Sequence, residues 1–353
     1  LQQYAVLRNH HNWHPTTILQ AFLSSLRLLC RKVAVVGKFL PSRSPKRFTE
    51  MYSQATVSDR DPNDSSDTGL PCRRNVQSAP FSVPEYAKSN HVQRRYCQFM
   101  LDFCQLAFST EPDQSQQFLD VGCGPGDFTR DVLLPRCLPC RRIVGVDFSR
   151  DMIEYARRNS AHKQLEFAVL DICSDVTGFL EEFGQFERVY SFFCLNWVED
   201  ISAALRNISR LMSSSGECLL VICAAVQIIE VWNILAKMDR WAKYSKTLLK
   251  FIPKTQDMKD KRELMRYISG LLRQADLFPT IMEALSSTIF DGWSEEEIIA
   301  VYHGVCPISH LVTCEEKLVL DTFFRDQFRK LHAPEAGRGH YRMLVVKASK
   351  APC

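Results

Sequence analysis

Short apolar runs alternate with segments of helical spacing along the middle of the chain. The runs span residues 117–121, 141–149, 165–172, 186–198 and 217–225. An alternation of strands and helices predicts a parallel sheet that is covered by helices. Because these runs are apolar at consecutive positions, they belong in the middle of such a sheet, where both faces are buried.

The segments between these runs carry signals for helix starts and ends. Residues 127–137 have helical spacing, and this helix is expected to stop at Pro135, which cannot donate a backbone hydrogen bond. Residues 149–159 follow with Ser149 as the N-cap residue. A third helix begins after the fourth run and is expected to end at Gly216.

The alternation breaks after Ala225. From there to about Lys330 the pattern is mostly helical, and the last strand-like run is 341–349. The predicted division of the chain is 1–80, a disordered or leader extension; 81–225, a Rossmann-like core; 226–340, a mostly helical insertion; and 341–353, a final strand and C-terminal tail.

The first 80 residues differ in composition from the rest. Residues 16–40 are apolar but contain Arg27, Arg31, Lys32 and Lys38, so no membrane span is expected, since a span needs about 20 mostly uncharged residues. An amphipathic, arginine-bearing leader resembles a transit peptide. Disordered or untranslated sequence is the alternative, and it is the one we favour.

Charge is spread unevenly along the chain. The whole chain has a net charge of +4. Residues 1–80 contain 11 Lys and Arg against 5 Asp and Glu, and the rest of the chain contains 33 Lys and Arg against 35 Asp and Glu. The predicted core and insertion are therefore close to neutral. Because nucleic-acid-binding domains usually present a basic face, no nucleic-acid partner is expected.

The 14 cysteines do not form the framework of a secreted protein. Cys123 and Cys194 lie inside apolar runs, where a free cysteine acts as a small hydrophobic side chain. Cys137 and Cys140 form a C-x-x-C pair, but no second pair follows at zinc-ligand spacing, so no metal site is expected. We interpret this pair as surface-loop thiols and infer a reducing, cytoplasmic compartment.

A glycine-rich turn follows the first strand in residues 118–128, FLDVGCGPGDF. Gly122, Gly124 and Gly126 form G-x-G-x-G, whereas the dinucleotide fingerprint is G-x-G-x-x-G and aims a helix N-terminus at a pyrophosphate. Here the third glycine comes one residue early, and Asp127 follows it as an anion where a phosphate would lie. The turn therefore predicts a cationic or zwitterionic ligand.

Acidic residues also end the strands beside this turn. Asp120 ends the first strand, Asp147 the second and Asp171 the third. Asp147 is placed to accept both hydroxyls of a ribose, and Asp171 is placed to receive an adenine amino group. Each acid alone also fits an N-cap or a solvated loop residue. Because open α/β sheets bind ligands at the carboxyl ends of their strands, the acids together favour a ligand site.

These motifs resemble the motif series of class I S-adenosylmethionine-dependent methyltransferases, on FLDVGCGPGDF, GVDFS, VLDI and FCLNWV. The resemblance implies a seven-stranded, mostly parallel sheet with an antiparallel last strand and a helical insertion over the substrate pocket. It also implies S-adenosyl-L-methionine as cofactor, whose sulfonium and ammonium groups fit an acidic rim. The implied cofactor-binding residues are Asp120, Gly122, Cys123, Gly124, Gly126, Asp147, Phe148, Asp171, Ile172 and Phe193.

A closer resemblance, over residues 84–348, is to the juvenile hormone acid O-methyltransferases, on VQRR, SFFCLNWV, EVWNILAKMDRW and VCPI. It implies an enzyme that esterifies the carboxylate of a small hydrophobic isoprenoid or fatty acid, such as farnesoic or juvenile hormone acid. An acid with a pKa near about 4 is already ionised at neutral pH, so catalysis becomes a matter of orientation. In the family a glutamine and a tryptophan hold that carboxylate, and they match Gln93 and Trp197. A solvated helix residue and a core aromatic are the alternative interpretations of these two positions.

The resemblance also implies the substrate pocket. Asn196 stands where insect members usually have histidine, which leaves the choice of acid open, although Asn can donate a hydrogen bond. Candidate lining residues in the insertion are Ile228, Val231, Trp232, Leu235 and Phe251, together with the residues around Val305 and Ile308. Helix-spaced apolar residues of this kind also fit an ordinary core.

Two other classes of function remain open at this point. One is a methyltransferase that acts on an amine, a phenol or a ring carbon, and the other is a non-catalytic binding protein of the same fold. The three glycines, Asp147 and Asp171 argue against a loss of cofactor binding. The sequence does not indicate an oligomeric state.

Overall fold

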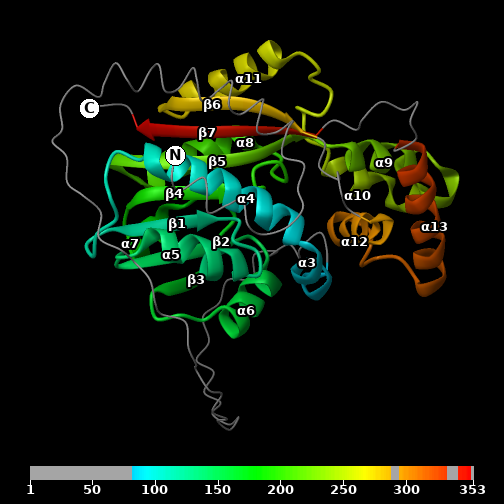
Figure 1. The fold of residues 1–353 in the computed structure, drawn as a ribbon, viewed down its shortest axis with the longest axis horizontal. Coiled ribbons are helices and arrows are strands. Elements are labelled where there is room, and N and C mark those ends of the chain that lie inside the picture. The colour runs from blue at the N-terminus through cyan, green and yellow to red at the C-terminus, as the bar shows by residue number, and fades with distance from the viewer. Residues whose placement is uncertain (1–81, 288–293, 332–340, 351–353) are drawn as a thin grey trace, which may run out of the picture. The chain divides into compact units, whose positions relative to one another are not determined.

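The computed structural model describes residues 82–287, 294–331 and 341–350. The predicted extension 1–80 lies outside these residues. The described strands form one seven-stranded sheet with the order β3-β2-β1-β4-β5-β7-β6 (Figure 1). The strands are β1 (Gln117–Val121), β2 (Arg142–Asp147), β3 (Leu165–Val169), β4 (Phe186–Phe192), β5 (Met212–Ala225), β6 (Leu277–Ser287) and β7 (Tyr341–Lys350).

The pairing of the strands confirms the predicted fold class. Strands β1 to β5 pair in parallel, and β7 runs antiparallel to both β5 and β6. The chain order reverses between β1 and β4, which lie side by side at the centre of the sheet. Open α/β sheets bind ligands in the crevice beside such a reversal, at the carboxyl ends of the strands.

Helices cover both faces of this sheet and its carboxyl edge (Figure 1). The helical segments are α3 (Val83–Ser89), α4 (His91–Cys104), η1 (Gln105–Ala107), η2 (Thr129–Leu133), α5 (Leu134–Cys137), α6 (Arg150–Asn159), α7 (Thr177–Phe183), α8 (Ile201–Leu211), α9 (Gln227–Ala236), η3 (Asp239–Tyr244), α10 (Ser245–Lys250), α11 (Lys261–Gln274), α12 (Glu295–Val305) and α13 (Cys314–Leu331). We call α9, η3, α10, α12 and α13 the cap.

Alternation along the strands divides the buried side chains between the two faces of the sheet. Leu119 and Val144 belong to the core that α8 and α11 cover. Phe118 points to the other face, where its ring lies 6.4 Å from the ring of Tyr190, and the Tyr190 hydroxyl lies 3.7 Å from Cys137 Sγ of α5. Both faces are thus buried, as the continuous apolar runs predicted.

Two predicted helix ends are wrong. The helix that was expected to stop at Pro135 runs on to Cys137. A π-helical turn, η2, precedes α5. Pro135 lies in the first turn of α5, where its missing N–H matters little. The helix that was expected to end at Gly216 ends at Leu211. The residues after Leu211 are extended because Met212 pairs with Phe186, and a bulge follows that pair in the ladder.

The sixth strand lies inside the stretch 226–340 that was predicted as mostly helical. β6 is the edge strand, and a shift in its register with β7 occurs between Pro279 and Ile281. Proline is tolerated at sheet edges and bulges. Because one side of β6 is exposed, its sequence lacks the continuous apolar run that marks the central strands. The cap therefore consists of two segments of the chain, one before α11 and one after β6. The other predicted domain boundaries stay predictions.

Burial of the C-x-x-C pair overturns another expectation. Cys137 and Cys140 are 0% and 3% exposed, so they are not surface thiols. Cys137 closes α5 against the sheet, and burial raises the pKa of its thiol to about 12. The cysteines in the described ranges are free, and most are buried. Their number therefore reflects packing in the core.

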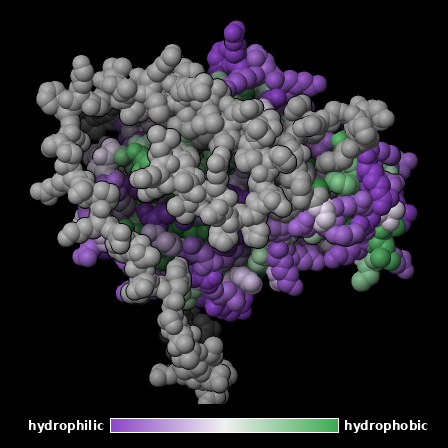
Figure 2. Space-filling view, viewed as in Figure 1, coloured by the Kyte–Doolittle hydropathy of each residue, from purple (hydrophilic) through white to green (hydrophobic). Residues whose placement is uncertain are grey.

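On the face drawn in Figure 2, the coloured surface is mostly hydrophilic, with separate apolar spots that include one over the cap. Exposed large apolar side chains in that region include Leu311 and Leu318. A search of the described residues finds no helix that is long and apolar enough to cross a membrane. Most apolar side chains of the cap are turned inward, toward a second hydrophobic core around Trp232 and Tyr302.

Candidate functional site

The glycine turn leaves β1 with three residues in the left-handed region of backbone space. Gly122, Gly124 and Gly126 have φ angles of 78°, 53° and 74°. L-residues with a Cβ adopt this region rarely, so the backbone itself requires glycine here. The Gly122 and Cys123 N–H groups both donate to the Val146 carbonyl, which ties the turn to the end of β2.

The three glycines differ in what surrounds them. A Cβ at Gly122 would lie 2.3 Å from Cys194 Cβ, and a Cβ at Gly126 would lie 2.8 Å from the Phe167 ring. At Gly124 the nearest atom, Cε1 of Tyr86, is 3.7 Å away. Gly122 and Gly126 are therefore needed for close packing, whereas Gly124 alone has room beside it for another molecule.

Asp147 at the end of β2 is bound to this turn. Its Oδ2 accepts the Gly124 N–H at 3.1 Å, and its Oδ1 accepts the Ser149 N–H at 2.9 Å. Burial raises the pKa of the Asp147 carboxyl to about 6, and these two hydrogen bonds oppose that rise. The N–H group that a phosphate-binding turn offers to its ligand is thus already used by a carboxylate.

Asp120 and Asp171 have different surroundings. Asp120 is buried at the end of β1 and accepts a hydrogen bond from Thr129 Oγ1 at 2.6 Å. Burial raises its pKa to about 7. Asp171 is exposed after β3, and its carboxylate accepts hydrogen bonds from the Cys173 N–H (2.9 Å) and the Ser174 hydroxyl (2.9 Å). A carboxylate has roughly four acceptor positions. At Asp147 and at Asp171 two of these positions are used within the protein, and two stay available for a ligand.

Asp127 does not present an uncompensated charge to the ligand, contrary to the prediction. Its carboxylate forms an ion pair with Arg94 of α4 and accepts hydrogen bonds from Asn90 Nδ2 at 3.3 Å. The negative charge is therefore compensated by the protein and does not decide against a phosphate. The Asp147 hydrogen bond to the Gly124 N–H supplies that argument instead.

The remaining predicted cofactor residues lie around the same turn. Cys123 and Phe193 are buried, and Phe148 is half-buried beside Asp147. Ile172 belongs with its side chain to the sheet core, and its carbonyl accepts a hydrogen bond from Asn207 Nδ2 at 2.9 Å. The Ile172 side chain and carbonyl are thus both used in packing within the protein.

Phe193 has an unusual backbone for a residue with a side chain. Its φ angle is 52°, and its N–H donates to the Val221 carbonyl at 2.8 Å. Such a conformation costs of the order of 1–2 kcal/mol and is found most often at functional sites. It turns the chain after β4 so that Cys194 packs under Gly122 while the next residues enter a pocket.

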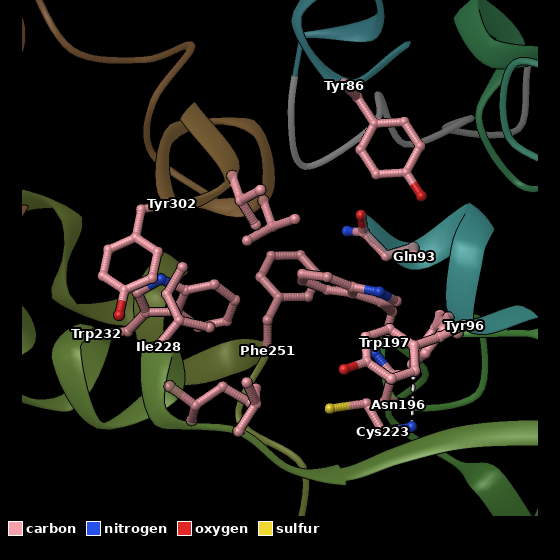
Figure 3. A pocket seen from close by; sticks show the side chains of 15 residues that line it. Tyr86, Gln93, Tyr96, Asn196, Trp197, Cys223, Ile228, Trp232, Phe251 and Tyr302 are labelled. Carbon is pink, nitrogen blue, oxygen red and sulfur yellow. Dashed lines mark hydrogen bonds between the residues drawn. The ribbon is translucent and has the colours of Figure 1, made fainter. Parts of the chain in front are cut away.

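A pocket lies between this rim and the cap (Figure 3). It encloses about 800 Å³, part of which is open to solvent. The lining is mostly aromatic and aliphatic and consists of Tyr86, Gln93, Tyr96, Phe193, Asn196, Trp197, Cys223, Val226, Ile228, Ile229, Trp232, Phe251, Val301, Tyr302 and Val305. Its size and apolar character are those of a site for a small hydrophobic molecule.

The two predicted carboxylate-holding residues lie in this pocket. Figure 3 shows Gln93 of α4 between Tyr86 and Trp197, with Trp232 and Tyr302 at the far side of the cavity. Oε1 of Gln93 is buried and has no hydrogen-bond partner among the described residues. Buried polar atoms are nearly always paired, and the O and N of an amide exchange places when the amide turns, so the Gln93 amide has one position open to a ligand.

Trp197 is held by its neighbours. Its ring centroid lies 5.9 Å from that of Trp232 and 5.8 Å from that of Phe251. The Asn196 amide fits in two orientations. In the one drawn in Figure 3, Oδ1 accepts the Cys223 N–H at 3.4 Å. In the reversed one, Oδ1 accepts the Trp197 Nε1–H at 3.0 Å and Nδ2 donates to the Phe193 carbonyl at 3.2 Å.

The predicted apolar lining is right in part. Ile228, Trp232, Phe251 and Val305 line the pocket. Val231, Leu235 and Ile308 do not, and each is 0% exposed in the core of the cap. On α9 the lining residues and the core residues share one broad apolar pattern. Periodicity therefore finds the helix but does not separate the side that faces the cavity from the side that faces other helices.

Several lining residues were missed by the sequence analysis, above all Tyr86 and Tyr302. Tyr302 follows Ile298 by one helical turn on α12, which marks a buried face without indicating a pocket. Tyr86 lies on α3, in a segment without a strong apolar pattern. Its one sequence signal is its place seven residues before Gln93.

Comparison with known proteins fits this geometry. Residues 119–220 match the family model described as a methyltransferase domain. Juvenile hormone acid O-methyltransferase from Drosophila melanogaster is 35% identical over 171 residues, 47% of this chain and 57% of that protein. The protein of the same name from Bombyx mori is 29% identical over 183 residues, 52% of this chain and 65% of that protein.

A more distant relative is the malonyl-[acyl-carrier protein] O-methyltransferase of Acetivibrio thermocellus, 33% identical over 131 residues, 37% of this chain and 41% of that protein. The chain thus spans less than two thirds of the length of each of these relatives. Together with the strand order and the glycine turn, these matches show that the chain contains a class I S-adenosylmethionine-dependent methyltransferase domain, that S-adenosylmethionine is its cofactor, and that its sequence is close to the juvenile hormone acid O-methyltransferases.

Proposed function

We propose that this protein transfers the methyl group of S-adenosylmethionine to the carboxylate of a small hydrophobic acid, of the isoprenoid or fatty type. The observation that carries the proposal is the chemistry of the pocket lining. It offers neutral hydrogen-bond donors at Gln93 and Trp197, and among its described residues there is no histidine, lysine or carboxylate. A carboxylate acceptor needs donors to orient it and no general base.

The rim residues fit the cofactor. Asp147 is placed to accept the ribose hydroxyls with the lone pairs that the Gly124 and Ser149 N–H groups leave unused. Asp171 is assigned to the adenine amino group, and Gly124 leaves open space beside Tyr86. When bound, the cofactor supplies an electrophilic methyl group on a sulfonium. The carboxylates of the buried Asp120 and the half-buried Asp147 favour a ligand with positive charge.

At the acceptor end, Gln93 and Trp197 are assigned to hold the two carboxylate oxygens through N–H groups. Trp197 has one donor, and in one orientation of the Asn196 amide that donor is used by Asn196. In the other orientation Asn196 accepts the Cys223 N–H instead. The role we assign to Asn196 is to orient the Trp197 indole, which it contacts in the first of these two orientations.

Acceptors that must lose a proton fit this pocket less well. The titratable groups in the described lining are the hydroxyls of Tyr86, Tyr96 and Tyr302 and the thiol of Cys223. Burial raises the pKa of Tyr86 and of Tyr302 above the usual range. Neither can act as a base near neutral pH. Ile228, Trp232 and Phe251 are assigned to the apolar body of the acid.

The proposal is tested by incubating the full chain with methyl-tritiated cofactor and a panel of acceptors. Farnesoic acid and saturated acids of different lengths should give an organic-extractable product that mild alkali hydrolyses, as expected for a methyl ester. The matching alcohol and amine should give none. Label on the amine, or on none of the acids, would refute carboxyl methylation.

Cofactor affinity should depend on pH through Asp147. Its pKa of about 6 in the free protein should fall when ribose hydroxyls donate to it, because these hydrogen bonds favour the ionised form. The cofactor then binds the deprotonated protein more tightly. Affinity should be constant above about pH 7 and fall by up to about tenfold per unit below pH 6.

Calorimetric titration between pH 5 and pH 8 measures this dependence. Asp147→Asn should bind weakly at every pH and lose the slope. Asp151→Asn is the control, because this carboxylate is exposed on α6 and has no assigned role in the cofactor site. An affinity that does not change between pH 5 and pH 7 would remove Asp147 from the cofactor site.

A further inference from the structure

Two residues of α4 reach across to the glycine turn. Arg94 forms an ion pair with Asp127, and its second terminal nitrogen lies 3.3 Å from Asp131. Asn90, which occupies the N-cap position of α4, makes no capping hydrogen bond. Its side chain donates to both oxygens of Asp127 at 3.3 Å instead. We call Asn90, Arg94 and Asp127 the clamp.

On α4 the clamp residue Arg94 directly follows Gln93, the residue assigned to hold the acceptor. Asn90 and Arg94 are four residues apart and therefore lie on the same side of the helix, where the Arg94 N–H also donates to the Asn90 carbonyl. Gln93 precedes Arg94 and faces the pocket (Figure 3). The direction in which Gln93 points is thus fixed by how α4 is held at its first turn.

The other side of the clamp is rigid. Asp127 directly follows Gly126, where a Cβ would lie 2.8 Å from the Phe167 ring and 2.9 Å from Ala156 Cβ. The backbone is therefore packed against β3 and α6 just before Asp127. The two clamp side chains that form the ion pair are 26% and 22% exposed, so water screens their attraction only in part.

We propose that the clamp is a positioning device that couples the cofactor turn to the acceptor site by setting Gln93 against the acceptor carboxylate. This inference rests on the proposed function for its chemical effect. Arg94 touches neither the pocket nor the open space beside Gly124, so it is a positioning residue. Loosening the clamp should let α4 shift, and an in-line transfer is sensitive to small displacements.

The neighbouring Arg95 provides a matched control. It is the next residue of the same helix, carries the same charge and is exposed. Arg94→Gln should lower kcat for methyl transfer to farnesoic acid by about 30-fold or more, with the cofactor Kd changed by less than about threefold. Arg95→Gln should change both quantities by less than about twofold. The reversed pair Arg94→Asp with Asp127→Arg should recover part of the kcat that either single reversal loses.

Hydrogen–deuterium exchange of the α4 peptide provides a readout that does not need activity. Exchange over residues 91–104 should rise in Arg94→Gln and not in Arg95→Gln. If the wild type methylates no acid but α4 exchange rises only in Arg94→Gln, the clamp stands and the proposed acceptor fails. Equal kcat and equal exchange in the two variants, or a loss of cofactor binding as large as the loss of kcat, would overturn the clamp as a positioning device.

Discussion

Gly124→Arg should abolish cofactor binding while the protein stays folded. The side chain would extend into the open space beside Tyr86, which is the space assigned to the cofactor. We expect the cofactor Kd to rise at least about 100-fold, a loss of about 2.7 kcal/mol. The left-handed backbone at a φ of 53° costs a non-glycine residue only about 1–2 kcal/mol.

Two further variants separate steric exclusion from backbone strain. Gly124→Ala introduces the same strain with a methyl group that has room, so it should keep most of the affinity and show the same loss of thermal stability as Gly124→Arg. Gly122→Ala should instead unfold or aggregate, since its Cβ would lie 2.3 Å from Cys194 Cβ. Calorimetric titration and thermal unfolding measure both effects. Equal cofactor affinity in Gly124→Arg and wild type would place the cofactor elsewhere.

Gln93→Glu should distinguish a carboxylate acceptor from an amine. The two side chains have nearly the same shape, but the variant replaces an N–H donor with a negative charge in a partly buried pocket. A carboxylate substrate would then be repelled, and kcat/KM for it should fall at least about 1000-fold, which is about 4 kcal/mol. A protonated amine would be attracted, and its kcat/KM should rise or stay constant.

The control for this experiment is Gln98→Glu, which makes the same change at an exposed position of α4. It should alter kcat/KM by less than about twofold. The rates are measured with farnesoic acid and with the amine of the same chain length. Retention of acid methylation in Gln93→Glu would show that this residue does not hold the acceptor.

Much of the cofactor side could be predicted from the sequence, because its signals are local. The first three strands are apolar runs, and each ends beside a glycine or acid that is assigned to the site, so Gly124 and Asp147 follow from their places in the chain. The carboxyl ends of parallel strands meet at one edge, which brings these residues together without further information. The left-handed angles at the three glycines are a local backbone property as well.

The acceptor side depends on contacts between distant segments, and local pattern does not encode them. Val231 and Trp232 are neighbours with the same apolar character and are both buried, yet the packing of the cap places only Trp232 in the wall of the cavity. β6 was missed for the same reason, because its partner β7 begins 54 residues after β6 ends and an edge strand needs little apolar sequence.

Asp127 shows the difference most clearly. From the sequence alone its charge belongs to the ligand site and argues against a phosphate. In the folded protein that charge is held by Arg94, 33 residues earlier in the chain. The sequence by itself determined the sheet, the glycine turn and the acidic rim. Only the tertiary structure decided which charges are left for a ligand, because a charge is compensated by whatever the fold brings within a few ångströms of it.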